Sequence, residues 1–431
     1  MRVYLSQMTK RVIVVGAGAA GTMAAIFAAA AGADTVLIES TRDGGRKILI
    51  SGGGRCNVLP SRVDESRFVT DSSSNLLRKM VRAWPLAGQR EFFEQTLRIP
   101  LVEESDSAKL FPASHRARDV RDGLMSQARA HGVRMVMDTR VTAIAPTTDG
   151  WVVSLDNDLP MTCHAVIIAT GGLSVPNTGS DGAGLQMLAV LGHTMHPTYA
   201  ALTPLTTNHA AFNALSGVSL VVSLTARSDE HAAQSAGGFL FTHHGYSGPS
   251  VLNVSHVAVR ARAARPSGQD GPNARRAGVR PFAVAHIQVQ WTALDEAAWE
   301  AALKPHGART VTGALRAELP DRLAAALLAQ AGVDPARGLS ELRREERHAL
   351  ITTLVRGELP WQGDEGYKKA EVTGGGVALG EVNPRTMESR RHPGLFLCGE
   401  VLDAFGPIGG YNFLWAWATG RAAGTGAAAQ A

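Results

Sequence analysis

Three glycines near the start of the chain have the types and spacing that suit phosphate chemistry. Gly16, Gly18 and Gly21 form a G-x-G-x-x-G motif. The first allows a tight turn, the second lets the backbone approach a pyrophosphate, and the third lets a helix pack closely on a strand. Glu39 follows 18 residues after Gly21, where a carboxylate can accept hydrogen bonds from a ribose 2′-OH. The motif therefore predicts a dinucleotide site.

The elements around this motif fit that prediction. Residues 12–15 and 35–38 are apolar and rich in β-branched residues, which is typical of buried strands, and the alanine-rich segment 22–31 predicts a helix between them. A secretory signal peptide is the competing interpretation, because Lys10 and Arg11 precede the apolar run. We reject it because the glycines would break its apolar segment and a strand follows in place of a cleavage site.

A second glycine-rich segment, residues 44–57, comes soon after Glu39. Its three consecutive glycines, residues 52–54, exclude a regular element and predict a tightly folded backbone or one pressed against a flat or anionic ligand. The neighbouring cations favour ligand contact over a flexible surface loop. Cys56 is interpreted as a packing residue and not as a catalytic one.

Later segments combine predicted strand ends with glycines. Residues 163–169 predict a strand followed by Gly171 and Gly172, and residues 394–398 predict one that ends at Gly399 and Glu400. Such strand ends let the backbone approach a ligand.

The helices of these outer parts are predicted from apolar spacing and caps. Residues 75–131 are predicted to be helical with a break at 110–114. Asp181 is predicted to cap a further helix. Residues 406–413 predict a glycine turn into a helix that runs to about residue 423.

The composition changes near residue 197, which predicts an inserted domain. Residues 218–224 and 287–291 alternate apolar and polar side chains, as strands with one polar face do, and residues 295–356 predict helices. The basic stretch 260–281 between them is interpreted as a mobile surface loop. The predicted domain limits are 1–196 and 371–431 for the nucleotide-binding domain and 197–370 for the insertion.

Composition and charge limit the class of protein. The chain has 431 residues, 45% of them hydrophobic, and a formal charge of +5, which indicates a globular protein. Its three cysteines are far apart, without a C-x-x-C motif, so we expect no disulfide framework and a reducing cytoplasm. The arginines are scattered, and no other apolar stretch is long enough for a membrane span. No metal, nucleic-acid or membrane partner is expected; the oligomeric state and the start at Met1 or Met8 stay open.

Together the motifs resemble those of FAD-binding flavoproteins of the two-dinucleotide-binding-domain type. Residues 45–47, 51–57, 373–377 and 409–412 narrow the resemblance to BaiN-type bacterial flavoproteins, also labelled aminoacetone-oxidase-like. The resemblance implies an α/β fold, with a Rossmann-like FAD-binding domain built from both chain ends and an inserted β-rich, barrel-like and helical domain. It implies non-covalent FAD, bound by Gly16, Gly18, Ala19, Ala20, Gly21, Glu39, Ser40, Gly45, Arg46, Lys47, Ser51, Gly52, Gly53, Gly54, Arg55, Asn57, Val141, Ala169, Thr170, Gly171, Gly172, Asp181, Gly399, Glu400, Gly409, Gly410, Tyr411, Asn412 and Phe413.

The resemblance also implies roles within that set. Glu400 would hydrogen-bond a flavin hydroxyl near the ribityl chain and pyrophosphate, and residues 410–412 would lie by the isoalloxazine. A helix that begins there places partial positive charge at the flavin N1/O2 edge, which favours the reduced flavin. Lys47 or Arg55 could add to that charge. The basic stretch 260–280 matches no motif of this family.

The predicted reaction is hydride transfer between flavin N5 and a small organic substrate. Two directions are open: reduction of an enone-type double bond with NAD(P)H as donor, or oxidation of an amine with O₂ as acceptor. Only one dinucleotide fingerprint is visible, so no separate NAD(P) domain is expected. A third interpretation is a flavin-carrying RNA-modification protein, which would require a basic, aromatic-bearing surface or an appended RNA module.

The sequence leaves the catalytic acid or base open. His243, His244 and Tyr246 are weak candidates, because a histidine can titrate near neutral pH. A histidine is more often a structural hydrogen-bonding residue, and two adjacent ones on a strand would face opposite ways.

Overall fold

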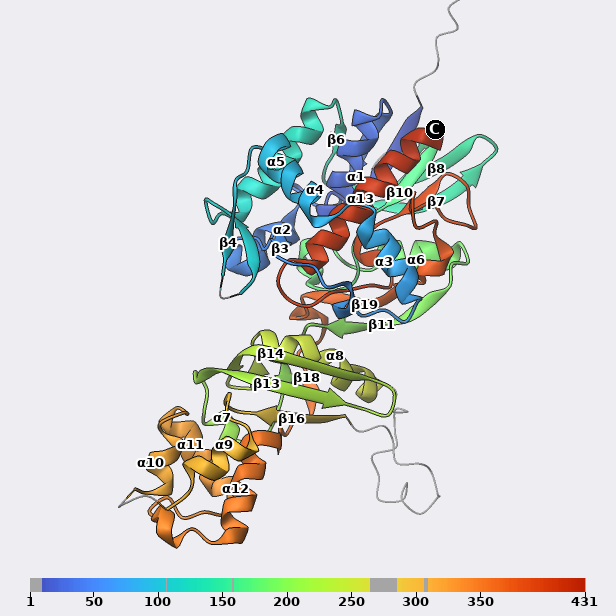
Figure 1. Ribbon diagram of the computed structural model, residues 1–431. Helices are drawn as coiled ribbons and strands as arrows, with labels where there is room; N and C mark the ends of the chain where they lie inside the picture. Colours follow the sequence, from blue (N-terminus) through green and yellow to red (C-terminus); the bar gives the residue numbers. More distant parts are fainter. Residues whose placement is uncertain (1–9, 106, 157–158, 264–284, 306–308, 431) are drawn as a thin grey trace, which may run out of the picture. The chain divides into compact units, whose positions relative to one another are not determined.

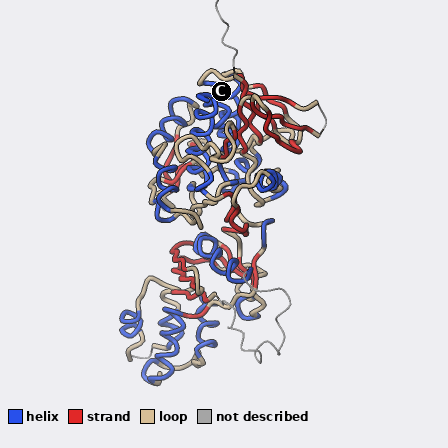
Figure 2. The backbone as a smooth tube through the Cα atoms, turned by 90° about the vertical axis from the view of Figure 1, so that its right-hand side faces the viewer, coloured by secondary structure: helices blue, strands red, loops and turns tan. Residues whose placement is uncertain are grey.

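The structure is a computed structural model that describes residues 10–105, 107–156, 159–263, 285–305 and 309–430. The chain forms two compact units: unit 1 comprises Met1–Thr198 and Val372–Ala431, and unit 2 comprises Tyr199–Glu371 (Figures 1 and 2). Each has its own hydrophobic core.

The core of unit 1 is a five-stranded parallel sheet. Its order is β20 (Leu395–Leu397), β10 (Ala165–Ile168), β1 (Arg11–Val15), β2 (Asp34–Ile38) and β6 (Arg134–Val136). Each of the first four strands is buried almost throughout, as expected for a parallel sheet covered on both faces. Because the strands are parallel, the segments that follow β1, β2, β10 and β20 meet at one edge of the sheet. This arrangement confirms the predicted Rossmann-like fold.

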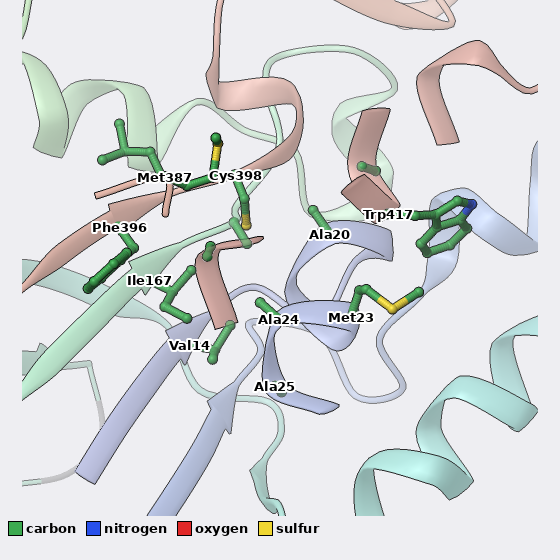
Figure 3. Packing of buried hydrophobic residues seen from close by; sticks show 14 of the residues in the cluster. Val14, Ala20, Met23, Ala24, Ala25, Ile167, Met387, Phe396, Cys398 and Trp417 are labelled. Carbon is green, nitrogen blue, oxygen red and sulfur yellow. The ribbon is translucent and has the colours of Figure 1, made fainter. Parts of the chain in front are cut away.

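Two helices from opposite ends of the chain pack together on this sheet: α1 (Ala19–Ala30) and α13 (Tyr411–Gln430). Figure 3 shows the small side chains of α1 beside apolar residues of β1 and β10. A Cβ atom on Gly420 would lie 2.4 Å from the Ala20 carbonyl oxygen, and one on Gly424 would lie 2.2 Å from that of Ala24. The helices therefore run in the same direction with their backbones in contact.

This contact predicts that Gly424→Ala destabilises the protein. In an exposed helix the same change stabilises by about 1 kcal/mol; here the methyl group would push α13 away from α1, an overpacking cost of about 1–3 kcal/mol. Thermal unfolding of the variant should therefore show a lower Tm. Gly123→Ala is the matched control, because its nearest neighbour is the flexible end of Ile99. A Tm equal to or above that of the control would contradict the close helix contact.

The rest of unit 1 surrounds the sheet with short elements. A small sheet has the order β3 (Leu59–Pro60), β5 (Lys109–Pro112) and β4 (Leu101–Glu104). The predicted break in the helices at 110–114 is confirmed, but the segment 109–112 is a strand that was not predicted: Leu110 and Phe111 are buried, and Pro112 stands at the strand end, where proline is tolerated. The remaining elements are α2 (Arg46–Ile50), α3 (Ser74–Arg82), α4 (Leu86–Glu91), α5 (Ala117–Ala130), α6 (Ala183–Val190), β7 (Val141–Thr147), β8 (Gly150–Leu155), β9 (Met161–Cys163), β11 (Met195–Ala201) and β19 (Val372–Val377).

Unit 2 contains a seven-stranded sheet that curls toward closure. Its order is β17 (Gly357–Glu358), β16 (His286–Gln290), β13 (Ser219–Arg227), β14 (Ala232–Phe241), β15 (Gly245–Ser247), β12 (Leu205–Thr206) and β18 (Gly363–Asp364). The two edge strands, β17 and β18, are five residues apart in the chain, a span of at most about 18 Å. A flat sheet would separate its edges by about 29 Å. The sheet must therefore curve, which confirms the predicted barrel-like character.

The helices of unit 2 are partly as predicted. α8 (Pro249–Ala263) packs on β13 and β14, and neither α8 nor β14 was predicted. The helical segment 295–356 contains α9 (Glu296–Ala302), α10 (Val311–Leu315), α11 (Asp321–Ala331) and α12 (Arg344–Arg356), and α7 (Ala210–Asn213) is a short additional turn. Residues 260–263 of the predicted loop belong to α8. Its residues 264–281 lie outside the described residues.

Two further observations concern the whole described chain. Within the described ranges, no helix is long and apolar enough to cross a bilayer. Cys56, Cys163 and Cys398 are all buried free thiols. Burial raises the pKa of Cys56 and of Cys163 to about 12 and raises that of Cys398 as well, so the prediction that Cys56 is a packing residue agrees with its environment.

Candidate active site

The first part of the site is the loop between β1 and α1. Gly16 has a φ of 101° and donates from its N–H to the Ile38 carbonyl oxygen at 2.8 Å. A Cβ atom on Gly21 would lie 1.8 Å from the Gly16 carbonyl oxygen, so the helix starts too close to the turn for any side chain there. Gly18 instead has open space beside its Cα atom, and the N-terminus of α1 has no side-chain cap. An uncapped, accessible helix start is a ready site for a phosphate group.

Glu39, at the end of β2, is fixed beside that loop. Its Oε2 accepts a hydrogen bond from the Ala17 N–H at 2.7 Å, and its Oε1 accepts bonds from the Thr41 N–H at 2.8 Å and the Thr41 hydroxyl at 2.7 Å. The Ser40 hydroxyl approaches Oε1 at 3.4 Å. The residue as a whole is only 8% exposed. Glu39 therefore connects the strand end to the glycine loop and presents a preoriented acceptor there.

The second glycine-rich segment folds as a tight left-handed turn. Gly52, Gly53 and Gly54 have φ values of 56°, 67° and 84°, a region that glycine occupies without steric cost. No atom lies within 4 Å of a Cβ placed on Gly53, so this turn presents open backbone. The Oδ1 atom of Asn57 is buried without a hydrogen-bond partner among the described residues and would lie 2.7 Å from a Cβ on Gly52. The turn thus has the conformation that the glycines predicted, and an unpaired acceptor lies against it.

An ion pair joins this segment to the end of β20. Lys47 Nζ donates to Glu400 Oε2 at 2.8 Å and to the Ser174 hydroxyl at 2.7 Å. The Ser174 hydroxyl and the Thr373 N–H donate to Glu400 Oε1, at 2.7 Å and 2.9 Å. The Lys47 and Glu400 side chains are 27% and 17% exposed. Residues from four separate segments therefore hold one charge pair at the sheet edge.

This environment determines the charge state of Glu400. Burial acts to raise its pKa, but the Lys47 ammonium group and the hydrogen bonds from Lys47, Ser174 and Thr373 outweigh burial, so the pKa lies below its usual 4.5. Glu400 is consequently ionised at neutral pH and compensates the charge of Lys47. The suggestion that Lys47 adds net positive charge at a flavin is therefore weakened by its own partner.

The turn before α13 is held by contacts within the protein. Gly410 has a φ of 91°, and a Cβ atom there would lie 2.3 Å from the Leu59 carbonyl carbon. The Asn412 side chain exchanges two hydrogen bonds with the Gly406 backbone, at 2.9 Å and 3.0 Å. The Tyr411 ring packs against Phe68. Tyr411 and Asn412 thus shape the turn, whereas the sequence assigned them contacts with a ring.

The helix starts on either side of this edge are staggered. Gly420 of α13 lies level with Ala20 of α1, and α13 begins nine residues earlier, at Tyr411. Because α1 begins only one residue before Ala20, the start of α13 lies eight residues, or about 12 Å at 1.5 Å per residue, beyond the start of α1 on the N-terminal side. Both positive helix ends therefore point the same way, one at the Gly16–Gly21 loop and one beyond it.

The other predicted cofactor residues are distributed along the same region. Thr170 Oγ1 is buried without a partner in the described part of the chain, and a Cβ on Gly172 would lie 2.3 Å from Thr373 Oγ1. Asp181 pairs with Arg140 and accepts a hydrogen bond from the Ala183 N–H, but the N-cap of α6 is Gly182, one residue after the position that the sequence predicted. Arg46 pairs with Asp43. Phe413 stacks on Trp417, with ring centroids 5.3 Å apart.

Some residues of the site were not identified from sequence. Ser174 and Thr373 complete the Lys47–Glu400 network, and Trp415 and Thr419 of α13 bond the Gly399 backbone, at 3.0 Å each. Lys109 packs over Gly409. Of these residues, only Thr373 had a feature in the sequence that could have identified it, because it stands directly before a glycine triplet.

The three catalytic candidates belong to unit 2. His243 and His244 are exposed on the turn between β14 and β15. Tyr246 is fully buried, its hydroxyl donates to the Pro360 carbonyl oxygen at 2.8 Å, and burial raises its pKa. Its role in the structure is to fix the segment between β17 and β18. We therefore do not assign acid or base chemistry to these residues.

Comparisons with known proteins place this site in a family. The family model described as HI0933-like protein Rossmann domain matches residues 10–426. The chain is 31% identical over 411 residues to a ribosomal RNA dihydrouridine synthase of Escherichia coli (strain K12), an alignment that covers 94% of this chain and 95% of that protein. It is 30% identical over 427 residues to a 3-dehydro-bile acid delta(4,6)-reductase of Clostridium scindens, covering 97% and 99%.

A third relative, a ribosomal RNA dihydrouridine synthase of Haemophilus influenzae, is 28% identical over 423 residues, covering 97% of this chain and 98% of that protein. These matches extend over both units and confirm the resemblance that the motifs carried. The chain therefore belongs to the HI0933-like family of Rossmann-domain flavoproteins and is an FAD-dependent oxidoreductase.

Proposed function

We propose that FAD lies along the edge of the parallel sheet, in contact with the residues named for it above. The N-terminus of α1 would face the pyrophosphate, and Glu39 would accept the adenosine ribose hydroxyls. The Lys47–Glu400 pair would lie near the ribityl chain, and the N-terminus of α13 would face the ring. The single observation that supports this placement best is the stagger of the two uniformly directed helix ends, because an extended dinucleotide needs both positions.

We further propose that the bound flavin reduces a carbon–carbon double bond conjugated with a carbonyl group. A reduced flavin supplies a hydride from N5, and the protein orients the substrate and provides a proton. The names of the relatives support this reaction class. Uridine has a C5–C6 double bond conjugated with its C4 carbonyl, and a 3-oxo-4,6-diene has the same arrangement. NAD(P)H is the proposed electron donor.

A uridine in ribosomal RNA is the second candidate substrate. Two of the three relatives carry that activity in their names, which argues against the sequence-based expectation of no nucleic-acid partner. Both candidates share one chemical step, so the proposal concerns the reaction class first. Amine oxidation with O₂ is the competing direction, and none of these three relatives carries it in its name.

The test is an anaerobic reaction with two substrate arms. FAD-loaded protein is reduced with NADH or NADPH and then mixed with a 3-oxo-4,6-diene steroid or with in vitro transcribed ribosomal RNA. The proposal expects flavin reoxidation in one arm, with two hydrogen atoms gained by the product in mass spectrometry. Reoxidation by O₂ alone, together with flavin reduction by a primary amine, would establish the oxidase direction instead.

Glu39→Ala should weaken FAD binding in this account. The change removes charge-assisted hydrogen bonds worth roughly 1.5–3 kcal/mol, and it also removes the acceptor of the Ala17 N–H. We expect FAD affinity, measured by fluorescence titration of the apoprotein, to fall about tenfold or more. Asp34→Ala serves as the control, because that carboxylate lies at the opposite end of β2. An affinity equal to that of the control would limit Glu39 to a structural role.

A further inference from the structure

One lysine beside the proposed flavin position has no role in the account above. Lys109 begins β5, and its side chain covers the turn that leads into α13: a Cβ atom on Gly409 would lie 3.3 Å from Lys109 Cε and 3.4 Å from Cγ. The side chain is only partly exposed. Within the described ranges its Nζ atom makes no hydrogen bond and no ion pair within 4 Å. The aliphatic part of the Lys109 side chain therefore packs on this turn, and in the described part of the chain no carboxylate pairs with its ammonium group.

The neighbours of Lys109 connect it to the second glycine-rich turn. Residues 109 and 111 of β5 face the same side of the strand. The Arg55 guanidinium lies over the Phe111 ring, 4.2 Å from its centroid, and pairs with Glu104 at 2.9 Å. Arg55 Nε also approaches the Gly52 carbonyl oxygen at 3.4 Å. The face of β5 that carries Lys109 thus adjoins the open glycine turn.

The burial of Lys109 favours proton release from its ammonium group. Burial lowers the pKa of Lys109 below its usual 10.5, the Arg55 guanidinium adds to the lowering, and Glu104 acts in the opposite direction. Glu104 is itself occupied by Arg55 and by the Ser107 hydroxyl. A lysine of this kind can act as a general acid, because its protonated form predominates at neutral pH and its proton is easier to remove.

Other groups of the site are poorer proton donors. Lys47 is paired with Glu400 and Ser174, and the Arg55 guanidinium is paired with Glu104. The Cys56 thiol is fully buried. The Tyr411 hydroxyl lies 3.3 Å from the Arg62 carbonyl oxygen, to which it donates.

We propose that Lys109 is the general acid of the reaction, a catalytic residue that protonates the substrate as the conjugated double bond is reduced. This inference rests on the proposed function. The hydride forms a C–H bond at the β-carbon, and the π electrons of the double bond move to the α-carbon and its carbonyl. The Nζ–H bond of Lys109 then breaks and its proton forms the α-carbon–H bond. Water reprotonates the neutral amine, and reduced nicotinamide restores the flavin.

The first test measures the lysine without turnover. The chain has seven lysines, so ¹³C-methylation of the FAD-loaded protein gives a simple NMR spectrum in which Lys109→Arg assigns the resonance. We expect Lys109 to titrate below 10.5, in the direction that its burial requires. Titration at or above 10.5 would overturn the inference, and this result does not depend on knowing the substrate.

The second test separates the half-reactions under anaerobic conditions. Lys109→Met should retain FAD and be reduced by NAD(P)H within about twofold of wild type, whereas reoxidation by the conjugated substrate should slow 10²–10⁴-fold, roughly the contribution of a general acid. Lys109→Arg should be equally slow, since it keeps the charge but cannot release a proton. In wild type this rate should fall as the pH rises through the pKa found by NMR, and Lys109→Met should lack that alkaline loss.

The controls separate a failure of the proposed reaction from a failure of the role assigned to Lys109. Lys79→Met removes an exposed lysine on α3 and should behave as wild type. If wild type fails to transfer hydride to either substrate, the proposed function fails, and the NMR titration still reports on Lys109. If wild type is active and Lys109→Met reoxidises within fivefold of it, or loses FAD, Lys109 is not the general acid.

Discussion

Gly410→Val is expected to give a protein that unfolds at a much lower temperature and retains little FAD. A side chain at this position meets two obstacles: a φ of 91° and the Leu59 carbonyl carbon 2.3 Å from the new Cβ. Backbone strain and overpacking each cost about 1–3 kcal/mol, so the loss of stability should be about 2–6 kcal/mol. The start of α13 would have to move, and with it the turn that we place at the flavin ring.

The measurements are thermal unfolding and the FAD content of the purified variant. Gly380→Val is a suitable control, because Gly380 is exposed, has an ordinary φ and has no atom within 4 Å of a built Cβ. If Gly410→Val retains FAD, its midpoint potential should be lower than that of wild type, since the positive helix end would lie further from the reduced flavin. A variant with the Tm, FAD content and potential of the control would refute this placement of the turn.

Lys47→Met is expected to destabilise the folded protein because it leaves the Glu400 carboxylate without its counter-charge. Breaking a fully buried pair costs about 3–5 kcal/mol. Here the side chains are 27% and 17% exposed, so we expect about 1–3 kcal/mol at pH 7. The double variant Lys47→Met with Glu400→Gln should lose less than Lys47→Met alone, since no unpaired charge remains.

The effect should depend on pH in a defined direction. The folded-state pKa of Glu400 lies below its usual 4.5, so the pair stabilises the protein above about pH 4.5 and this contribution is lost as the pH falls through the folded-state pKa. The difference in unfolding free energy between wild type and Lys47→Met should therefore narrow on acidification. Denaturant unfolding of both proteins at pH 7 and near pH 4 measures this difference. Two results together would mean that Lys47 and Glu400 are not coupled. The difference in unfolding free energy between wild type and Lys47→Met would be equal at both pH values, and the losses from Lys47→Met and Glu400→Gln would add up in the double variant.

The glycine positions explain why much of unit 1 was predictable. Gly16 and Gly21 are needed by local backbone geometry, in a turn and in a strand–helix contact, and both requirements are visible in a short motif. The sequence marked Gly410 as a position by the flavin ring, whereas the constraint that the structure shows there is the Leu59 backbone, 2.3 Å from a built Cβ atom. A motif can therefore identify a constrained position without identifying the atom that constrains it.

The features that could not be predicted from the sequence depend on contacts between residues far apart in the chain. Lys47 and Glu400 are separated by 353 residues, and no local pattern pairs them. Tyr246 follows two histidines in a segment that resembles a site, yet its ring is buried and its hydroxyl is bonded to residue 360. Strand β5 lies at the predicted break of a segment expected to be helical, and only its pairing with β4 identifies it as a strand. Each error reflects tertiary packing that outweighs a local preference.

The cofactor released from the purified protein identifies directly what occupies the edge of the parallel sheet. We expect a yellow protein with a flavin absorption spectrum. Denaturation should release FAD in a ratio of one per chain, because the Glu39 ribose site and the staggered helix ends require the adenosine half. A folded, colourless protein that cannot be reconstituted with FAD, or one that releases FMN, would contradict the claim.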